Sequence, residues 1–70
     1  MTATIETWHG TVTISEPYFS MIRYKRVICL TFTKPENKGN GYGISKEFDE
    51  DFELSRAAIE RFAMEASELL

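Results

Sequence analysis

The spacing of the apolar residues changes once along this chain, and that change limits the folds open to it. Within three segments between Thr4 and about Phe48, apolar side chains recur mostly at every second position, as they do in half-buried strands. After Ser55 they recur at helical spacing. A run of strands followed by one helix predicts an α+β fold, in which a small antiparallel β-sheet of three to four strands packs one face against a C-terminal α-helix.

The expected elements are bounded by residues that end strands or begin helices. Pro17 and Pro35 lack the amide hydrogen that a strand ladder needs, and Asn40-Gly41 is typical of a hairpin loop. Ser55 is a favoured N-cap residue. The sequence therefore predicts strands at about 4–14, 21–33 and 42–48 and a helix at about 55–70.

Alternation within each strand predicts which side chains enter the core. In the first strand Trp8 shares the apolar face with Val12, so we expect Trp8 in the core. Gly10 lies on the same face and indicates a bulge or the close approach of a neighbouring segment. Phe62 is expected to close the core from the centre of the helical stripe. The buried face of the second strand is expected to hold Ile22, Tyr24, Ile28, Leu30 and Phe32.

The length of the chain allows one domain, residues 1–70, with a small core. Its 43% of apolar residues favours a compact fold over a disordered tail. The single cysteine, Cys29, cannot form an internal disulfide, and with His9 as the one histidine a zinc site lacks ligands. We expect no metal and no cofactor. Because a small core without such staples is marginal, a homodimer is an open alternative.

The sequence gives no sign of export or of membrane insertion. Residues 1–14 show neither a basic segment nor a continuous apolar run of the kind that signal peptides carry. No apolar stretch approaches the roughly 20 residues that cross a bilayer. Together with the unpaired Cys29, these features predict a cytoplasmic protein that does not contact a membrane.

The charges are sorted by position. Residues 1–46 hold six bases against three acids, a net charge of +3, whereas residues 47–70 hold eight acids against two bases, a net charge of −6. This asymmetry suggests a surface that meets a charged partner. The candidate partner-binding residues are Glu47, Asp49, Glu50, Asp51 and Glu53, and the secondary candidate surface is formed by Arg23, Lys25 and Arg26.

The acidic segment, residues 47–53, is the first candidate for binding. In an extended chain the carboxylates at positions 49, 51 and 53 recur about every 6.8 Å on one face. Phosphates of one DNA strand recur about every 7 Å. A row of carboxylates anchored by Phe48 and Phe52 would imitate nucleic acid and occupy a basic groove on another protein. The alternative interpretation is a solvated linker whose acids lie near the positive end of the helix.

The basic segment, residues 18–26, interleaves bases with aromatic residues, a pattern that suits phosphates and unpaired bases. The net charge of −3, however, argues against a protein that binds nucleic acid directly. Its bases are expected instead to pair with the acidic segment, either of the same chain or of a second copy.

No catalytic pattern stands out, so we expect a protein that is not an enzyme. His9 has no neighbouring nucleophile, and the glycines of residues 38–43 precede a strand rather than a phosphate-binding helix. The first hypothesis is a module that binds a protein with a basic surface. In size and charge alone, the chain resembles the inhibitors that bacteriophages encode against host proteins, including anti-CRISPR proteins. The alternatives are a structural or accessory subunit of a dimer or larger assembly and a small nucleic-acid-binding module that uses the basic strand.

Overall fold

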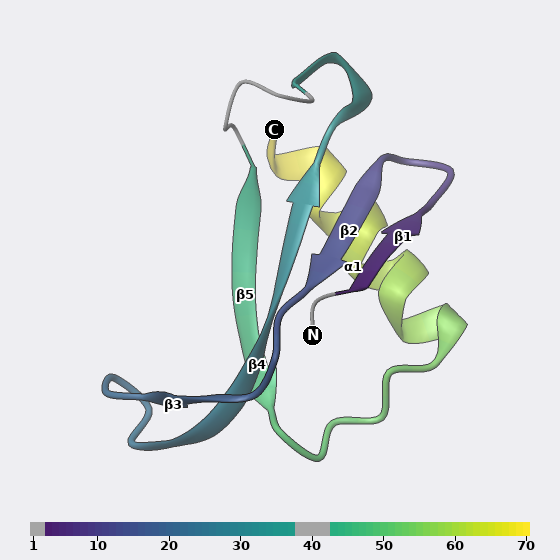
Figure 1. The fold of residues 1–70 in the computed structure, drawn as a ribbon. Coiled ribbons are helices and arrows are strands. Elements are labelled where there is room, and N and C mark those ends of the chain that lie inside the picture. Colours follow the sequence, from purple (N-terminus) through teal and green to yellow (C-terminus); the bar gives the residue numbers. More distant parts are fainter. Residues whose placement is uncertain (1–2, 38–42) are drawn as a thin grey trace.

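The computed structural model describes residues 3–37 and 43–70 of the chain (Figure 1). These residues form an antiparallel sheet of five strands and one C-terminal helix, so the predicted α+β class is confirmed. The strands are β1 (Ala3–Glu6), β2 (Thr11–Ile14), β3 (Tyr18–Ser20), β4 (Lys25–Thr33) and β5 (Ile44–Asp49). A short 3-10 helix, η1 (Pro35–Asn37), follows β4, and the α-helix is α1 (Arg56–Leu69).

The longest strand, β4, lies at the centre of the sheet and pairs along both of its edges. On one edge its C-terminal half pairs with β2, which pairs in turn with β1, and its N-terminal end pairs with β3. On the other edge β5 pairs with β4 from Val27 to Phe32. Helix α1 crosses one face of this sheet, whereas β3 and the turn after it project to one side, away from the helix (Figure 1).

The core lies between α1 and the sheet. Ile28, Leu30 and Phe32 occupy alternate positions of β4 and are buried, as the alternation predicts. Val12 joins them from the neighbouring strand. The helix contributes Ile59, Phe62, Ala63 and Ala66, and the partly buried residues around this cluster are Ile5, Ile14, Ile44, Phe48 and Leu54. The predicted apolar stripe of the helix therefore closes the core.

Helix α1 begins where the sequence predicts. Ser55 has an extended backbone, and its hydroxyl accepts a hydrogen bond from the Ala58 N–H at 3.2 Å, as an N-cap residue does. The helix ends at Leu69. Among the described residues, no helix is long and apolar enough to cross a membrane.

The single strand expected at 4–14 is wrong, because a tight turn divides it into β1 and β2. The Thr7 N–H donates to the Gly10 carbonyl oxygen at 2.7 Å, and the Thr7 hydroxyl accepts from the Gly10 N–H at 3.1 Å. Trp8 therefore lies in the turn and is 93% exposed rather than in the core. The predicted close approach at Gly10 is confirmed, since a Cβ there would lie 2.5 Å from the Thr33 carbonyl oxygen.

The strand expected at 21–33 begins four residues later, at Lys25, because a second turn precedes it. Tyr24 has a φ of +56°, in the left-handed region, and its N–H donates to the Ser20 carbonyl oxygen at 2.7 Å. Ile22 and Tyr24 consequently leave the predicted buried face and are 94% and 79% exposed.

The return strand expected at 42–48 is β5, which the structure places at Ile44–Asp49. It pairs antiparallel with β4, so the hairpin that the sequence predicts is confirmed. The expected loop residues Asn40-Gly41 and the strand start at Tyr42 lie outside the described residues.

Candidate functional site

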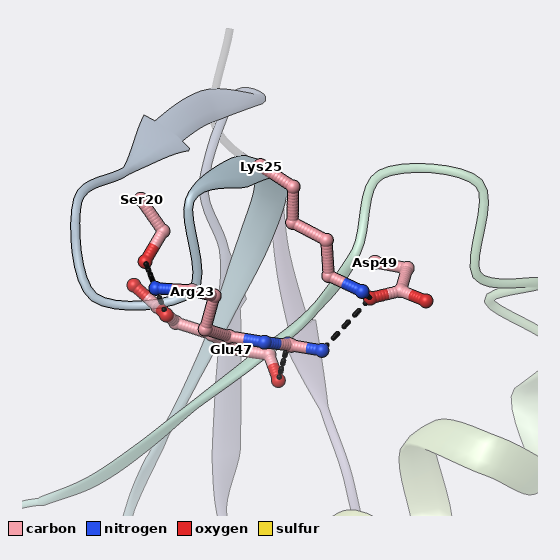
Figure 2. Close-up of polar contacts among 5 residues, drawn as sticks. All are labelled: Ser20, Arg23, Lys25, Glu47 and Asp49. Carbon is pink, nitrogen blue, oxygen red and sulfur yellow. Dashed lines mark hydrogen bonds and ion pairs between the residues drawn. The ribbon is translucent and has the colours of Figure 1, made fainter.

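Acidic residues of β5 and polar residues of the β3–β4 hairpin meet on the sheet face opposite α1. Glu47 accepts hydrogen bonds from the Tyr18 hydroxyl at 2.6 Å and the Ser20 hydroxyl at 2.9 Å. Asp49 Oδ1 lies 2.9 Å from Arg23 Nη2 and 2.6 Å from Lys25 Nζ (Figure 2). We call this set the polar clamp; its members are Tyr18, Ser20, Arg23, Lys25, Glu47 and Asp49.

Strand register brings the polar clamp together. Val27 of β4 is paired with Tyr18 of β3 on one side and with Asp49 of β5 on the other. Because directly opposite residues of antiparallel strands share a face, all three side chains lie on the face away from α1. Val27 is fully buried there between polar neighbours.

The polar clamp also fixes the turn between β3 and β4. The Arg23 guanidinium donates through Nη1 to the Glu47 carbonyl oxygen at 3.1 Å, in addition to its contact with Asp49 (Figure 2). The Ser20 hydroxyl accepts from the Arg23 N–H at 3.2 Å. The backbone of the turn and one of its side chains are thus both tied to neighbouring strands.

Hydrogen bonding in the clamp displaces three pKa values. The bond from Tyr18, and then that from Ser20, lowers the pKa of the Glu47 carboxyl. The same bond to Glu47 raises the pKa of Tyr18 to about 12, because it favours the neutral phenol. The hydrogen bond from Lys25, assisted by the charges of Lys25 and Arg23, lowers the pKa of Asp49.

The turn that the clamp fixes carries exposed apolar side chains. We call residues 19–24 the hairpin tip. Ile22 is 94% exposed and Met21 is 78% exposed. The rings of Phe19 and Tyr24 pack edge to face, with centroids 5.5 Å apart, and both remain exposed. The tip therefore presents an apolar surface to solvent.

The candidate surfaces proposed from the sequence lie together rather than apart. Glu47 and Asp49 contact Arg23 or Lys25 within the clamp, and Glu50 Oε2 lies 3.0 Å from Arg26 Nε. Of the two pairings expected for the basic segment, the structure shows the one with the acidic segment of the same chain.

The evenly spaced row of carboxylates does not form. Strand β5 ends at Asp49, and the Phe52 N–H donates to the Asp49 carbonyl oxygen at 2.9 Å, so the chain turns instead of remaining extended. Asp51 and Glu53 are exposed and form no ion pair with the residues that the structure describes. The expected anchor Phe52 packs on Phe48, with ring centroids 4.7 Å apart.

A pocket of about 290 Å³ lies between the end of β5 and the first turns of α1. The rings of Phe48, Phe52 and Phe62 line it, together with the small side chains of Ala57 and Ala58. We call this the α1 pocket. Arg61 also lines it and, like Asp51, forms no ion pair with a described residue.

Sequence reasoning singled out residues 18–26 for their bases and aromatic rings but did not identify an exposed apolar turn within them. The available signal is the group of apolar residues directly beside three bases, but strand alternation assigned two of them, Ile22 and Tyr24, to the core. Within residues 3–37 and 43–70, no three His, Cys, Asp or Glu side chains are grouped so as to hold a metal ion. No family model, curated protein or solved structure matches the chain.

Proposed function

We propose that this chain is a non-enzymatic protein-binding module that docks through its hairpin tip. The observation that carries the proposal is the exposure of Met21, Ile22 and Tyr24 on a turn that polar contacts hold in place. Apolar residues gathered on a projecting element are typical of interaction surfaces. An exposed Leu or Ile alone is ordinary, but here four apolar side chains share one turn.

The arrangement of the tip suits tight binding. A loop that is already ordered loses less conformational entropy when it binds than a flexible loop does. The left-handed backbone of Tyr24 supports the same interpretation, since such conformations in residues other than glycine concentrate at functional sites.

The partner that fits this surface is a protein with an apolar cleft. The bases near the tip, Arg23, Lys25 and Arg26, are paired with acids of the same chain, which weakens their attraction for phosphates or anionic lipids without removing it. Of the candidate acids, Asp51 and Glu53 form no ion pair with a described residue and stay available to a basic surface of the partner. Inhibition of a nucleic-acid-binding protein in the cytoplasm, as the sequence suggests, stays a prediction that depends on these two residues.

The test begins with a photo-crosslinking residue placed at position 22 or, as the control, at the exposed position 69. A protein of the native host that crosslinks only from position 22 is then purified and titrated with the unmodified chain. We expect Ile22→Ser to weaken that binding at least about tenfold, because Ile22 would lose its burial.

A second variant separates the tip from the acidic segment. Asp51→Asn combined with Glu53→Gln should change the affinity less than Ile22→Ser does, since rim charges act mainly on the association rate. If the acidic variant loses binding while Ile22→Ser binds as the parent does, the acidic segment is the contact and the tip is not.

A further inference from the structure

The α1 pocket has the chemistry of a receptor for an apolar side chain. Three phenylalanine rings form its walls, and Ala57 and Ala58 are too small to fill it. Its volume of about 290 Å³ is an opening of a size that side chains of a partner can enter. The same chain carries exposed apolar side chains, Met21 and Ile22, at the hairpin tip.

A chain's own tip does not occupy its own pocket. The turn between β3 and β4 projects away from α1, and the two lie on different sides of the molecule (Figure 1). Any contact between a tip and an α1 pocket must therefore join two molecules.

The charges around the two surfaces are complementary. Phe52 of the pocket is flanked in the chain by Asp51 and Glu53, and Arg61 also lines the pocket. None of the three forms an ion pair with a described residue, so acids outnumber bases there. The tip is flanked by Lys25 and Arg26, whose side chains remain 46% and 55% exposed despite their intramolecular ion pairs. Such opposite charges steer two copies into a head-to-tail orientation and disfavour head-to-head contact.

Resting on the proposed function of the tip, we infer that its partner in the purified protein is the α1 pocket of a second copy. The contact is heterologous: the tip of one molecule enters the pocket of the next, so the molecules either close into a ring or extend into a chain. Self-association shields the apolar tip until another protein competes for it.

Sedimentation velocity over a concentration series tests this inference with four proteins. We expect the parent and the control Leu69→Ser, which alters an exposed apolar residue on α1, to associate with rising concentration and less at high salt. Ile22→Ser, which lacks the apolar tip, and Ala58→Phe, which fills the pocket, should both remain monomeric. If Ala58→Phe does not fold, Ala57→Phe replaces it, because Ala57 is exposed and also lines the pocket.

Mixing the two monomeric variants gives the decisive result. Ile22→Ser retains an open pocket and Ala58→Phe retains an intact tip, so one contact forms between them and the mixture should contain a 1:1 heterodimer and nothing larger. A parent that stays monomeric, a filled-pocket variant that associates like the parent, or a mixture that stays monomeric would each overturn the inference.

The outcomes also separate this inference from the proposed function. If Ala58→Phe self-associates normally while Ile22→Ser still loses the crosslinked host protein, the pocket is not the receptor and the proposed function stands. If Ile22→Ser abolishes self-association but binds that host protein as the parent does, the proposed function fails and the head-to-tail contact stands.

Discussion

Arg23 Nη2 lies 2.9 Å from Asp49 Oδ1, and this ion pair joins the turn of the β3–β4 hairpin to the end of β5. The same guanidinium donates to the carbonyl oxygen of Glu47, so the turn is held at two points of one strand. Exposed ion pairs contribute little singly, whereas several that share partners act as a network. We therefore expect the apolar tip to keep its shape without a partner.

The loss of stability at acidic pH should reveal the contribution of the polar clamp. The folded-state pKa values of Glu47 and Asp49 are lowered, so both carboxylates stabilise the fold above their ordinary pKa values, and this contribution is lost as the pH falls through the lowered values. Urea unfolding at a series of acidic pH values should show a smaller loss of stability in Glu47→Gln combined with Asp49→Asn. If the parent and the double variant lose the same free energy of unfolding as the pH falls, this prediction is contradicted.

Tyr18 should titrate well above the ordinary pKa of a tyrosine. Its hydrogen bond to Glu47 raises its pKa to about 12, so its contribution to stability is complete below its ordinary pKa and is lost as the pH rises through about 12. Ultraviolet absorbance of the phenolate should reveal one late step that is missing in Tyr18→Phe. In Glu47→Gln this step should move to lower pH; if it does not move, the bond to Glu47 is not its cause.

Phe62 should carry much of the stability of the core. It is buried at the centre of α1, and its ring packs edge to face on Phe48 at 6.0 Å. We expect Phe62→Ala to lower the free energy of unfolding by about 3–5 kcal/mol. Met64→Ala, on the same helix but exposed, is the control and should change it by about 0.5 kcal/mol. Equal effects from the two variants would show that α1 is peripheral to the core.

The left-handed backbone of Tyr24 should lower the free energy of unfolding. A residue with a side chain loses about 1 kcal/mol in the left-handed conformation that glycine adopts freely. Tyr24→Ala and Tyr24→Gly both remove the ring that packs on Phe19. We therefore expect Tyr24→Gly to unfold at higher urea concentration than Tyr24→Ala. The opposite order would mean that the turn changes conformation in one of the variants.

The parts of the fold that depend on local spacing could be predicted from the sequence. Ile28, Leu30 and Phe32 follow the alternation of a strand, and Ser55 has the side chain that caps a helix, so both the central strand and the start of α1 were correctly expected. Pairing of the basic strand with the acidic segment followed from opposite charge alone.

The turns could not be predicted, because each depends on the conformation of one residue whose type does not indicate a turn. Thr7 directs its hydroxyl into a turn although threonine favours strands, and this turn exposes Trp8. Tyr24 adopts a left-handed backbone that aromatic residues rarely use. The hairpin tip depends on that residue. Because strand alternation assumes an unbroken strand through Tyr24, it placed Ile22 and Tyr24 inside the core.

Backbone order in the hairpin tip tests most directly whether the polar clamp holds the tip in place. Nuclear magnetic resonance relaxation should be measured for residues 19–24 in Ile22→Ser, a background in which self-association cannot order the tip. We predict amide order parameters near those of a rigid backbone, about 0.85, which fall below about 0.6 when Arg23→Gln is added. If the order parameters of the tip are already low while Arg23 is intact, the polar clamp does not hold the apolar surface in place.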